Sequence, residues 1–276
     1  MNKLQLTKVC HKIAKNTGLT FNSVMTYYFL ESVLKKLANS SYKDKFVFKG
    51  GFLLSNIVGL QSRSTVDMDF LIQNYTLSKE SIIGALTECL VSHSDDLIIY
   101  EILDIEDIRE EDKYGGLRVK IMCKLENIRQ LVPLDIATGD VITPFPITYD
   151  YISAFDENRI EINAYNLETM IAEKLETLYR RDLLNSRSKD FYDLYILSKL
   201  KFDEINTENL KKACEATFKY RTTEFDLSKI SETLNRIEND KTMAERWNVY
   251  AKKNIYASGI SYVELISVIR TILETL

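Results

Sequence analysis

The pattern of apolar and polar positions changes its period along this 276-residue chain. Between residues 5 and 40 apolar side chains recur at helical spacing, as at Val9, Ile13, Val24 and Tyr28, which predicts helices. The segment that follows holds short runs rich in β-branched and apolar residues, which predict strands. These runs are 46–48, 66–72, 97–105, 117–125 and 131–137.

Local signals place helices and turns between these strands. Helices are expected over 52–60 and 78–92, and Ser78 stands where it can cap the second of them. The adjacent glycines Gly115 and Gly116 predict a hairpin turn between two antiparallel strands. All three prolines fall between residues 133 and 146, and this cluster marks the end of the strand-rich part.

The rest of the chain has a helical pattern after one more β-like run, RIEINAY. Asn166 can cap the first of these helices, and the later ones are KDFYDLYILSKL, NTENLKKACEATFKY and two or three amphipathic segments up to Leu276. We therefore predict an α+β protein of two domains. Residues 1–150 form a mixed α/β domain with N-terminal helices, and residues 151–276 form a mainly helical domain.

The composition narrows the function classes. Hydrophobic residues make up 45% of the chain and charged residues 28%, which predicts a soluble globular protein. We expect no signal peptide and no membrane span, and the four scattered cysteines indicate reduced thiols in the cytoplasm. With only two histidines, neither a His-based zinc site nor a Ser-His-Asp triad is expected. The net charge is -4, so any nucleic-acid contact must depend on a local basic patch.

Two carboxylates stand out in the run VDMDFLI. Side chains on a strand alternate between faces, so Asp67 and Asp69 are expected to share one face while Val66, Met68 and Phe70 point into the core. Two carboxylates about 4 Å apart repel by about 4 kcal/mol at an effective dielectric near 20. The pair is either a solvated face of an edge strand or a site whose charge a cation neutralises.

A third acid, Asp135 in LVPLDIA, also stands alone between apolar residues of a predicted strand. Three acids from adjacent strand ends would form an oxygen-ligand site for Mg²⁺, suited to two-metal chemistry. Asp104 and Asp107 are weaker candidates, because they lie at a strand end, next to and within the acid-rich run IEDIREED, which is expected to be a solvated loop.

The glycine pair Gly50–Gly51 follows a predicted strand and precedes a predicted helix. Without Cβ atoms, these residues allow a phosphate to approach the backbone and the N–H groups of the helix N-terminus. The alternative is an ordinary turn. The chain contains neither a P-loop nor a dinucleotide fingerprint.

The order of these features resembles the nucleotidyltransferase superfamily: a glycine pair after a strand, an apolar-flanked Asp-x-Asp, and a single Asp on a later strand. The stretch KGGFLLSNIVGLQSRSTVDMDFLI is similar to the AbiEii/AbiGii-type toxins of bacterial abortive-infection systems. In that family a KGG stretch leads to an Arg and two Asp, here Arg63, Asp67 and Asp69. EKLETLYRR matches the family's Glu-Lys-Leu helix through Glu173 and Lys174.

A further element, RSKDFYDLY, resembles a motif of the same family through Arg187, Lys189, Asp190 and Asp193. The resemblance covers roughly residues 45–200. It implies a nucleotidyltransferase-like sheet followed by a helical domain that closes the cleft.

The resemblance also implies roles for these residues. Asp67, Asp69 and Asp135 would hold two Mg²⁺ ions against the phosphates of an NTP, and Asp135 would help to activate the acceptor hydroxyl. Gly50 and Gly51 would cradle the β- and γ-phosphates. Lys174 would contact the triphosphate, its alternative being a solvated lysine on an amphipathic helix.

Other side chains of the helical part are assigned to the site or to its surroundings. Asp190 and Asp193 lie three residues apart on one helix face and are expected near the cleft with the nucleotide-binding Lys189, although a structural ion-pair cluster is the alternative. The neighbouring aromatic residues are expected to pack in the core. A basic patch for an RNA backbone is expected from Arg180, Arg181 and Arg187, although the first two are equally read as solvated side chains.

The resemblance implies the toxin of a toxin–antitoxin system, which transfers a nucleotide to RNA, most simply to the 3′ end of a tRNA. It also implies a cognate antitoxin that acts genetically or by direct binding. The alternatives are a nucleotidyltransferase that modifies a protein or a small molecule, and a non-catalytic nucleotide-binding module. A haloacid-dehalogenase phosphatase is rejected because Leu71 stands where its motif needs Thr or Val.

Overall fold

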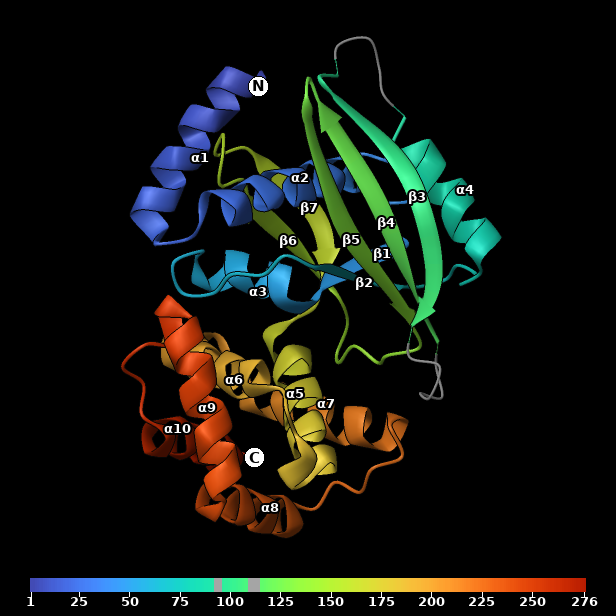
Figure 1. The fold of residues 1–276 in the computed structure, drawn as a ribbon. Helices are drawn as coiled ribbons and strands as arrows, with labels where there is room; N and C mark the ends of the chain where they lie inside the picture. The colour runs from blue at the N-terminus through green and yellow to red at the C-terminus, as the bar shows by residue number, and fades with distance from the viewer. Residues whose placement is uncertain (92–95, 109–114) are drawn as a thin grey trace. The chain divides into compact units, whose positions relative to one another are not determined.

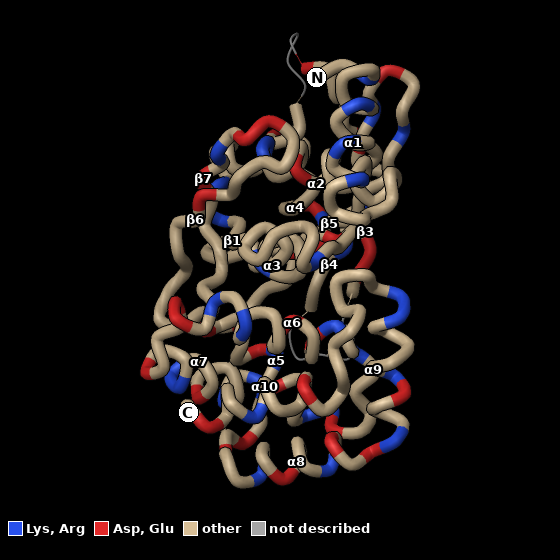
Figure 2. The backbone as a smooth tube through the Cα atoms, turned by 90° about the vertical axis from the view of Figure 1, so that its left-hand side faces the viewer, with Lys and Arg blue, Asp and Glu red and all other residues tan. Residues whose placement is uncertain are grey.

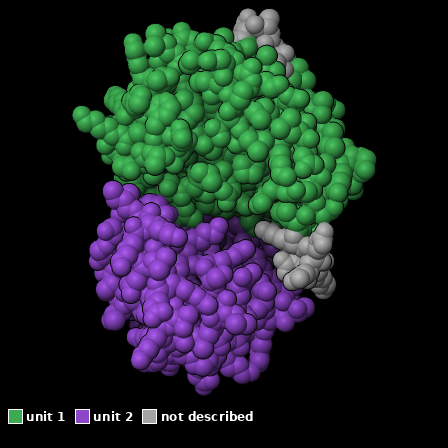
Figure 3. Space-filling view, in the orientation of Figure 1, with its two compact units in different colours: residues 1–139, 147–164 green, residues 140–146, 165–276 purple. Residues whose placement is uncertain are grey.

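The computed structural model describes residues 1–91, 96–108 and 115–276. The chain forms two compact units (Figure 3): residues 1–139 and 147–164 make up the first, and residues 140–146 and 165–276 the second. Basic and acidic residues are spread over both units (Figure 2). No helix among the described residues is long and apolar enough to span a bilayer.

One mixed sheet organises the first unit. Within the described residues its strand order is β3-β4-β5-β2-β1-β7-β6 (Figure 1). The pairs β2/β5 and β1/β7 are parallel and the other neighbours are antiparallel. The strands are β1 (Phe46–Lys49), β2 (Met68–Ile72), β3 (Ile98–Ile108), β4 (Gly116–Leu125), β5 (Ile128–Thr138), β6 (Ile147–Ile152) and β7 (Arg159–Ala164).

Three helices described in this unit, α1, α2 and α4, begin where a side chain of the local sequence caps them. An Asn2–Gln5 capping box starts α1, Thr20 caps α2, and the Ser78 side chain accepts the Ser81 N–H at the start of α4, which confirms the predicted cap. Helix α2 packs against β5 and β7 (Figure 1). The helices are α1 (Lys3–Thr17), α2 (Phe21–Ala38), α3 (Gly50–Val58) and α4 (Lys79–Cys89).

The second unit is helical and has its own core. Asn166 accepts the Thr169 N–H and so caps α5, as predicted, while its amide donates to the carbonyls of Thr143 and Phe145. These bonds explain why residues 140–146 belong to this unit. Its helices are α5 (Leu167–Arg181), α6 (Ser188–Lys201), α7 (Thr207–Tyr220), α8 (Leu227–Asn239), α9 (Lys241–Lys253) and α10 (Tyr262–Glu274).

The predicted α+β class is confirmed by this mixed sheet with its helices and by the helical C-terminal part. The prediction that the aromatic run of α6 packs in the core is also confirmed, because its members are buried: Phe191, Tyr192 and Tyr195. Strand β6 was not predicted. The hairpin prediction is tested in part: β3 and β4 pair antiparallel, but residues 109–114 lie outside the described residues.

Two sequence predictions are wrong. Val66 is 49% exposed rather than in the core, because β2 begins only at Met68 and the alternation of faces does not extend to residue 66. Asp107 lies in β3, which extends to Ile108, and not in a loop, and it pairs there with Lys79. Asp104 lies in β3 as well, within the strand predicted over 97–105, and pairs with Lys120. Residues 109–112 of the same acidic run lie outside the described residues.

Candidate active site: a row of charges across the sheet

Five charged residues are aligned across five neighbouring strands. Lys49 on β1 is in register with Asp69 on β2, and Asp69 with Asp135 on β5. Asp135 is in register with Arg118 on β4, which faces Glu106 on β3. Residues in register project from the same face of a sheet. The two acids at the centre of this charge row therefore lie on strands about 4.8 Å apart.

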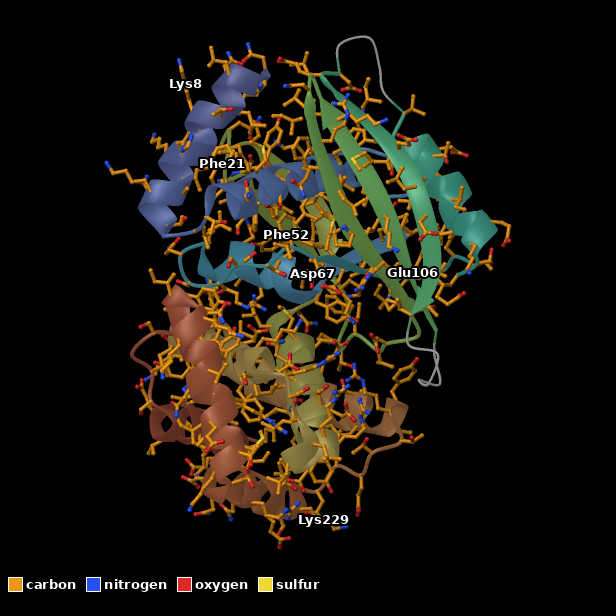
Figure 4. The ribbon with its side chains drawn as sticks, in the orientation of Figure 1. Lys8, Phe21, Phe52, Asp67, Glu106 and Lys229 are labelled. Atoms are coloured by element: carbon orange, nitrogen blue, oxygen red, sulfur yellow. The ribbon has the colours of Figure 1, made fainter. Side chains whose placement is uncertain are left out.

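The alternation of each strand puts this row on one face. Asp69 stands between the buried Met68 and Phe70, and Asp135 between the buried Leu134 and Ile136. The apolar neighbours pack into the core, which turns the carboxylates to the opposite face. Asp67 precedes β2 and is half-buried. Asp67 and Glu106 lie toward the same end of the long strands (Figure 4).

Arg118 binds Asp135 with two parallel hydrogen bonds. Its Nε lies 2.7 Å from Oδ1 and its Nη2 lies 2.7 Å from Oδ2. The hydrogen bond to Asp135 is the main reason that the pKa of Arg118 is raised, and the charges of Asp135, Asp67 and Glu106 add to it. A bidentate pair of this kind fixes orientation as well as charge. The carboxylate of Asp135 is thus held in place by a residue that the sequence analysis missed.

Gly50 leaves space for the Asp69 carboxylate. A Cβ at position 50 would lie 2.0 Å from Asp69 Oδ2, and the residue has a φ of +74°, which favours glycine. The sequence analysis assigned this glycine to phosphate binding. The structure shows a separate steric reason for it, while the phosphate-binding role of Gly50 and Gly51 stays a prediction.

Helix α3 begins at this glycine pair. Lys49 occupies its N-cap position, and a lysine side chain has no acceptor with which to cap a helix. The first backbone N–H groups of α3 are therefore not capped by this residue, and a helix N-terminus of this kind attracts anions. A Cβ on Gly51 would lie 3.3 Å from Thr65 Oγ1 and 3.4 Å from Arg63 Nη2, which places this buried arginine beside the helix start.

Asp67 and Asp69 have the chemistry to hold a metal ion that is bound together with a nucleotide, and this site stays a prediction. Among the described residues, no three Asp, Glu, His or Cys side chains converge closely enough to hold a metal by themselves. However, Mg²⁺ is usually bound by one or two carboxylates plus substrate phosphates, and not by an all-protein cage. The predicted Mg²⁺ site at Asp67 and Asp69 would be of this kind, beside the first turn of α3, whose N-cap residue Lys49 makes no side-chain capping bond. Asp135 is the adjacent third acid, at present bound by Arg118.

In the second unit, Lys174 joins the two acids of α6. Its Nζ lies 3.2 Å from Asp190 Oδ1 and 2.6 Å from Asp193 Oδ2. The side chains are 17%, 10% and 2% exposed, respectively. Lys174 is therefore not a solvated lysine. Asp190 Oδ2 is buried and has no hydrogen-bond partner among the described residues, so this carboxylate is only partly satisfied.

The predicted RNA-binding residues lie in different surroundings. Arg180 Nε binds Glu176 Oε1 at 2.9 Å, whereas Arg187 and Lys189 are exposed at the start of α6. Arg181 is half-buried, with its Nε buried and without a hydrogen-bond partner in the described structure. Their contact with RNA stays a prediction.

The sequence analysis missed a second arginine, Arg221. Its Nη1 lies 2.9 Å from Glu176 Oε2, and its Nη2 lies 3.6 Å from Glu173 Oε1 and 3.5 Å from Asp140 Oδ1. Two of these acids lie one turn apart on α5, but Asp140 and Arg221 are distant from them in the sequence, so no local motif could reveal their common partner.

Comparison with known proteins decides the family. Residues 32–263 match the family described as the nucleotidyl transferase AbiEii toxin of type IV toxin–antitoxin systems. The chain belongs to the AbiEii toxin family. The predicted resemblance is thereby confirmed, and membership implies a nucleotidyltransferase and an antitoxin partner. No curated protein matches the chain closely enough to count as a relative.

Two crystal structures from Helicobacter pylori share the fold of this AbiEii member. One carries the name of a nucleotidyltransferase and is 19% identical, covering 94% of this chain and 97% of its own, with a TM-score of 0.53. The other, JHP933, is 18% identical and covers 94% of both chains, with a TM-score of 0.50. At this level of identity the likeness supports the fold alone.

We predict that Gly50→Ala destabilises the first unit and displaces Asp69. A positive φ costs an L-residue about 1–2 kcal/mol, and the added Cβ overlaps Asp69 Oδ2. Urea unfolding followed by circular dichroism measures the loss. Gly84→Ala is the control, because a Cβ there meets nothing within 4 Å and alanine in a helix gains about 0.5–1 kcal/mol over glycine. A Gly50→Ala protein as stable as wild type would contradict the proposed steric role.

We also predict that Lys174→Met destabilises the second unit by about 3–5 kcal/mol, because it leaves buried acids without their cation. Trp247 is the sole tryptophan and is buried in this unit, so its fluorescence reports unfolding there. Adding Asp193→Asn should restore part of the loss. The control Lys212→Met removes an exposed pair with Glu208, which is worth less than about 1 kcal/mol. Equal stability of the two lysine variants would show that the buried pairing contributes nothing.

Proposed function

We propose that this toxin transfers a nucleoside monophosphate from an NTP to a hydroxyl of RNA, at the 3′ end of a tRNA. The observation that supports the proposal most is the charge row, in which Asp69 and Asp135 stand in register on neighbouring strands with Asp67 two residues before Asp69. Family membership supports nucleotidyl transfer. The RNA acceptor goes beyond the family match, and an RNA end supplies the hydroxyl that such a site needs.

Three residues of the charge row, Asp69, Asp135 and Arg118, have a task in this proposal, together with Asp67. Asp67 and Asp69 would hold Mg²⁺ together with the nucleotide phosphates, and the bound ion would supply charge neutralisation at the α-phosphate. The first turn of α3 after Gly50 and Gly51 donates backbone N–H groups to the β- and γ-phosphates. Arg118 orients the Asp135 carboxylate and limits its repulsion with Asp69.

The reaction forms one bond and breaks one. The acceptor oxygen bonds to the α-phosphorus while the bond from that phosphorus to the β-bridging oxygen breaks, and pyrophosphate leaves. The Asp135 carboxylate accepts the proton of the acceptor hydroxyl. The nucleotide-site roles of Lys174, Lys189, Asp190 and Asp193 stay predictions. A cognate antitoxin limits the activity in the cell.

The test is to incubate the purified protein and Mg²⁺ with total RNA and each α-labelled NTP in turn. We expect label in the tRNA band, and sequencing of the 3′ termini should show added nucleotides. Asp69→Asn should lower the rate more than about 100-fold, since even outer partners of a metal site are worth about 10- to 100-fold. Asp107→Asn is the matched control, because this acid lies on β3 in an exposed pair with Lys79.

The outcomes separate the parts of the proposal. Label on a protein band, with unchanged tRNA ends, would replace RNA by a protein acceptor while retaining nucleotidyl transfer. Full activity of Asp69→Asn would show that the charge row is not the active site.

A further inference from the structure

The N-terminal helix differs in charge from the rest of the chain. The first acidic residue of the sequence is Glu31, and the 30 residues before it contain four lysines. The remaining residues carry 32 basic against 40 acidic side chains. All four lysines lie in α1 (Figure 2). Because the chain as a whole is acidic, the basic charge of this helix does not follow from the overall composition.

Three of these lysines form one exposed face, which we call the α1 basic face: Lys8, Lys12 and Lys15. At 3.6 residues per turn they span about 60° of the helix circumference and about 10 Å of its length. Lys8 projects away from the fold (Figure 4). The opposite side of the helix buries Leu6 and Cys10. The lysines are thus presented together on the outer side of a packed helix.

Both ends of α1 are fixed. The Asn2–Gln5 capping box closes its start, Gly18 with a φ of 74° closes its end, and the Lys3 N–H donates to Glu126 Oε1 at 2.9 Å. Because the helix is anchored, its lysines would lose less entropy on binding a partner than lysines on a mobile tail.

The three lysines have no acidic partner among the described residues. The next helix shows the contrast: Lys35 pairs with Glu31 and Asp156, and Lys36 pairs with Asp96. Internal ion pairs neutralise those charges, whereas the α1 basic face retains all of its charge for an external anion.

We infer that the α1 basic face binds the phosphate backbone of the RNA acceptor, an inference that rests on the proposed function. Phosphates along a nucleic acid match several cations in a row, and each contact releases counterions. A lipid surface fits less well, because interfacial helices expose an apolar face and that of α1 is covered by the protein, with Leu4 its one large exposed apolar side chain in the described structure. The family match begins at residue 32, so this surface lies outside the matched residues.

The inference predicts the size of the salt effect. Each phosphate contact with a single strand contributes a slope of about 0.7 in a plot of log K against log salt. Removing three contacts should lower the slope by about two. The affinity should then fall on the order of 100-fold at 0.1 M salt and approach that of wild type near 1 M.

The experiment measures binding of fluorescently labelled bulk tRNA to the full chain by anisotropy over a range of salt. The variant Lys8→Gln/Lys12→Gln/Lys15→Gln should show the reduced slope. The control Lys211→Gln/Lys212→Gln/Lys219→Gln removes the same charge from three exposed lysines of α7 and should keep the wild-type slope. Equal slopes for both triple variants would overturn the inference. So would an α1 variant that binds tRNA normally but loses sedimentation with phosphatidylserine vesicles, because the partner would then be a lipid surface.

Transfer kinetics distinguish failure of this inference from failure of the proposed function. We expect the α1 variant to raise KM for RNA at least about 10-fold while leaving KM for the NTP unchanged. If wild type labels RNA and the α1 variant does so with the same KM, the inference fails and the proposed function stands. If wild type neither labels nor binds RNA, both fail.

Discussion

Asp69 and Asp135 stand side by side on neighbouring parallel strands, and their mutual repulsion must be balanced for the sheet to form. At about 4 Å and an effective dielectric near 20, two like charges cost about 4 kcal/mol. Basic residues flank Asp69 and Asp135 on both sides in the charge row, Lys49 on β1 and Arg118 on β4. Their positive charges offset the repulsion between the two acids. Arg118 binds both oxygens of Asp135.

The second unit uses the same principle in a less exposed setting. Lys174 lies between two acids, and Arg221 is within reach of three. Burying acids is unfavourable unless cations and hydrogen bonds compensate them. One of these clusters contains Lys174, Asp190 and Asp193, the residues whose sequence context resembles motifs of the AbiEii family.

Much of the fold was predictable because its signals are local. Period and caps predicted most helices and strands, and Ser78 and Asn166 cap the helices expected of them. The acids of the site were also found from their apolar neighbours. Register was not predictable, because it depends on pairing between distant segments. The role of Arg118 could be recognised only from the register, which places it opposite Asp135. Val66 was wrongly predicted to be in the core because the position at which a strand starts depends on its partner strand.

Mn²⁺ binding tests the central claim, that the charge row binds a metal–nucleotide complex, most directly. Electron paramagnetic resonance can follow Mn²⁺ titrated into the chain with a non-hydrolysable NTP analogue present. We expect binding that depends on the analogue and that Asp69→Asn weakens more than about 10-fold, while Asp107→Asn binds as wild type does. Mn²⁺ binding of equal strength in wild type and Asp69→Asn would contradict the claim.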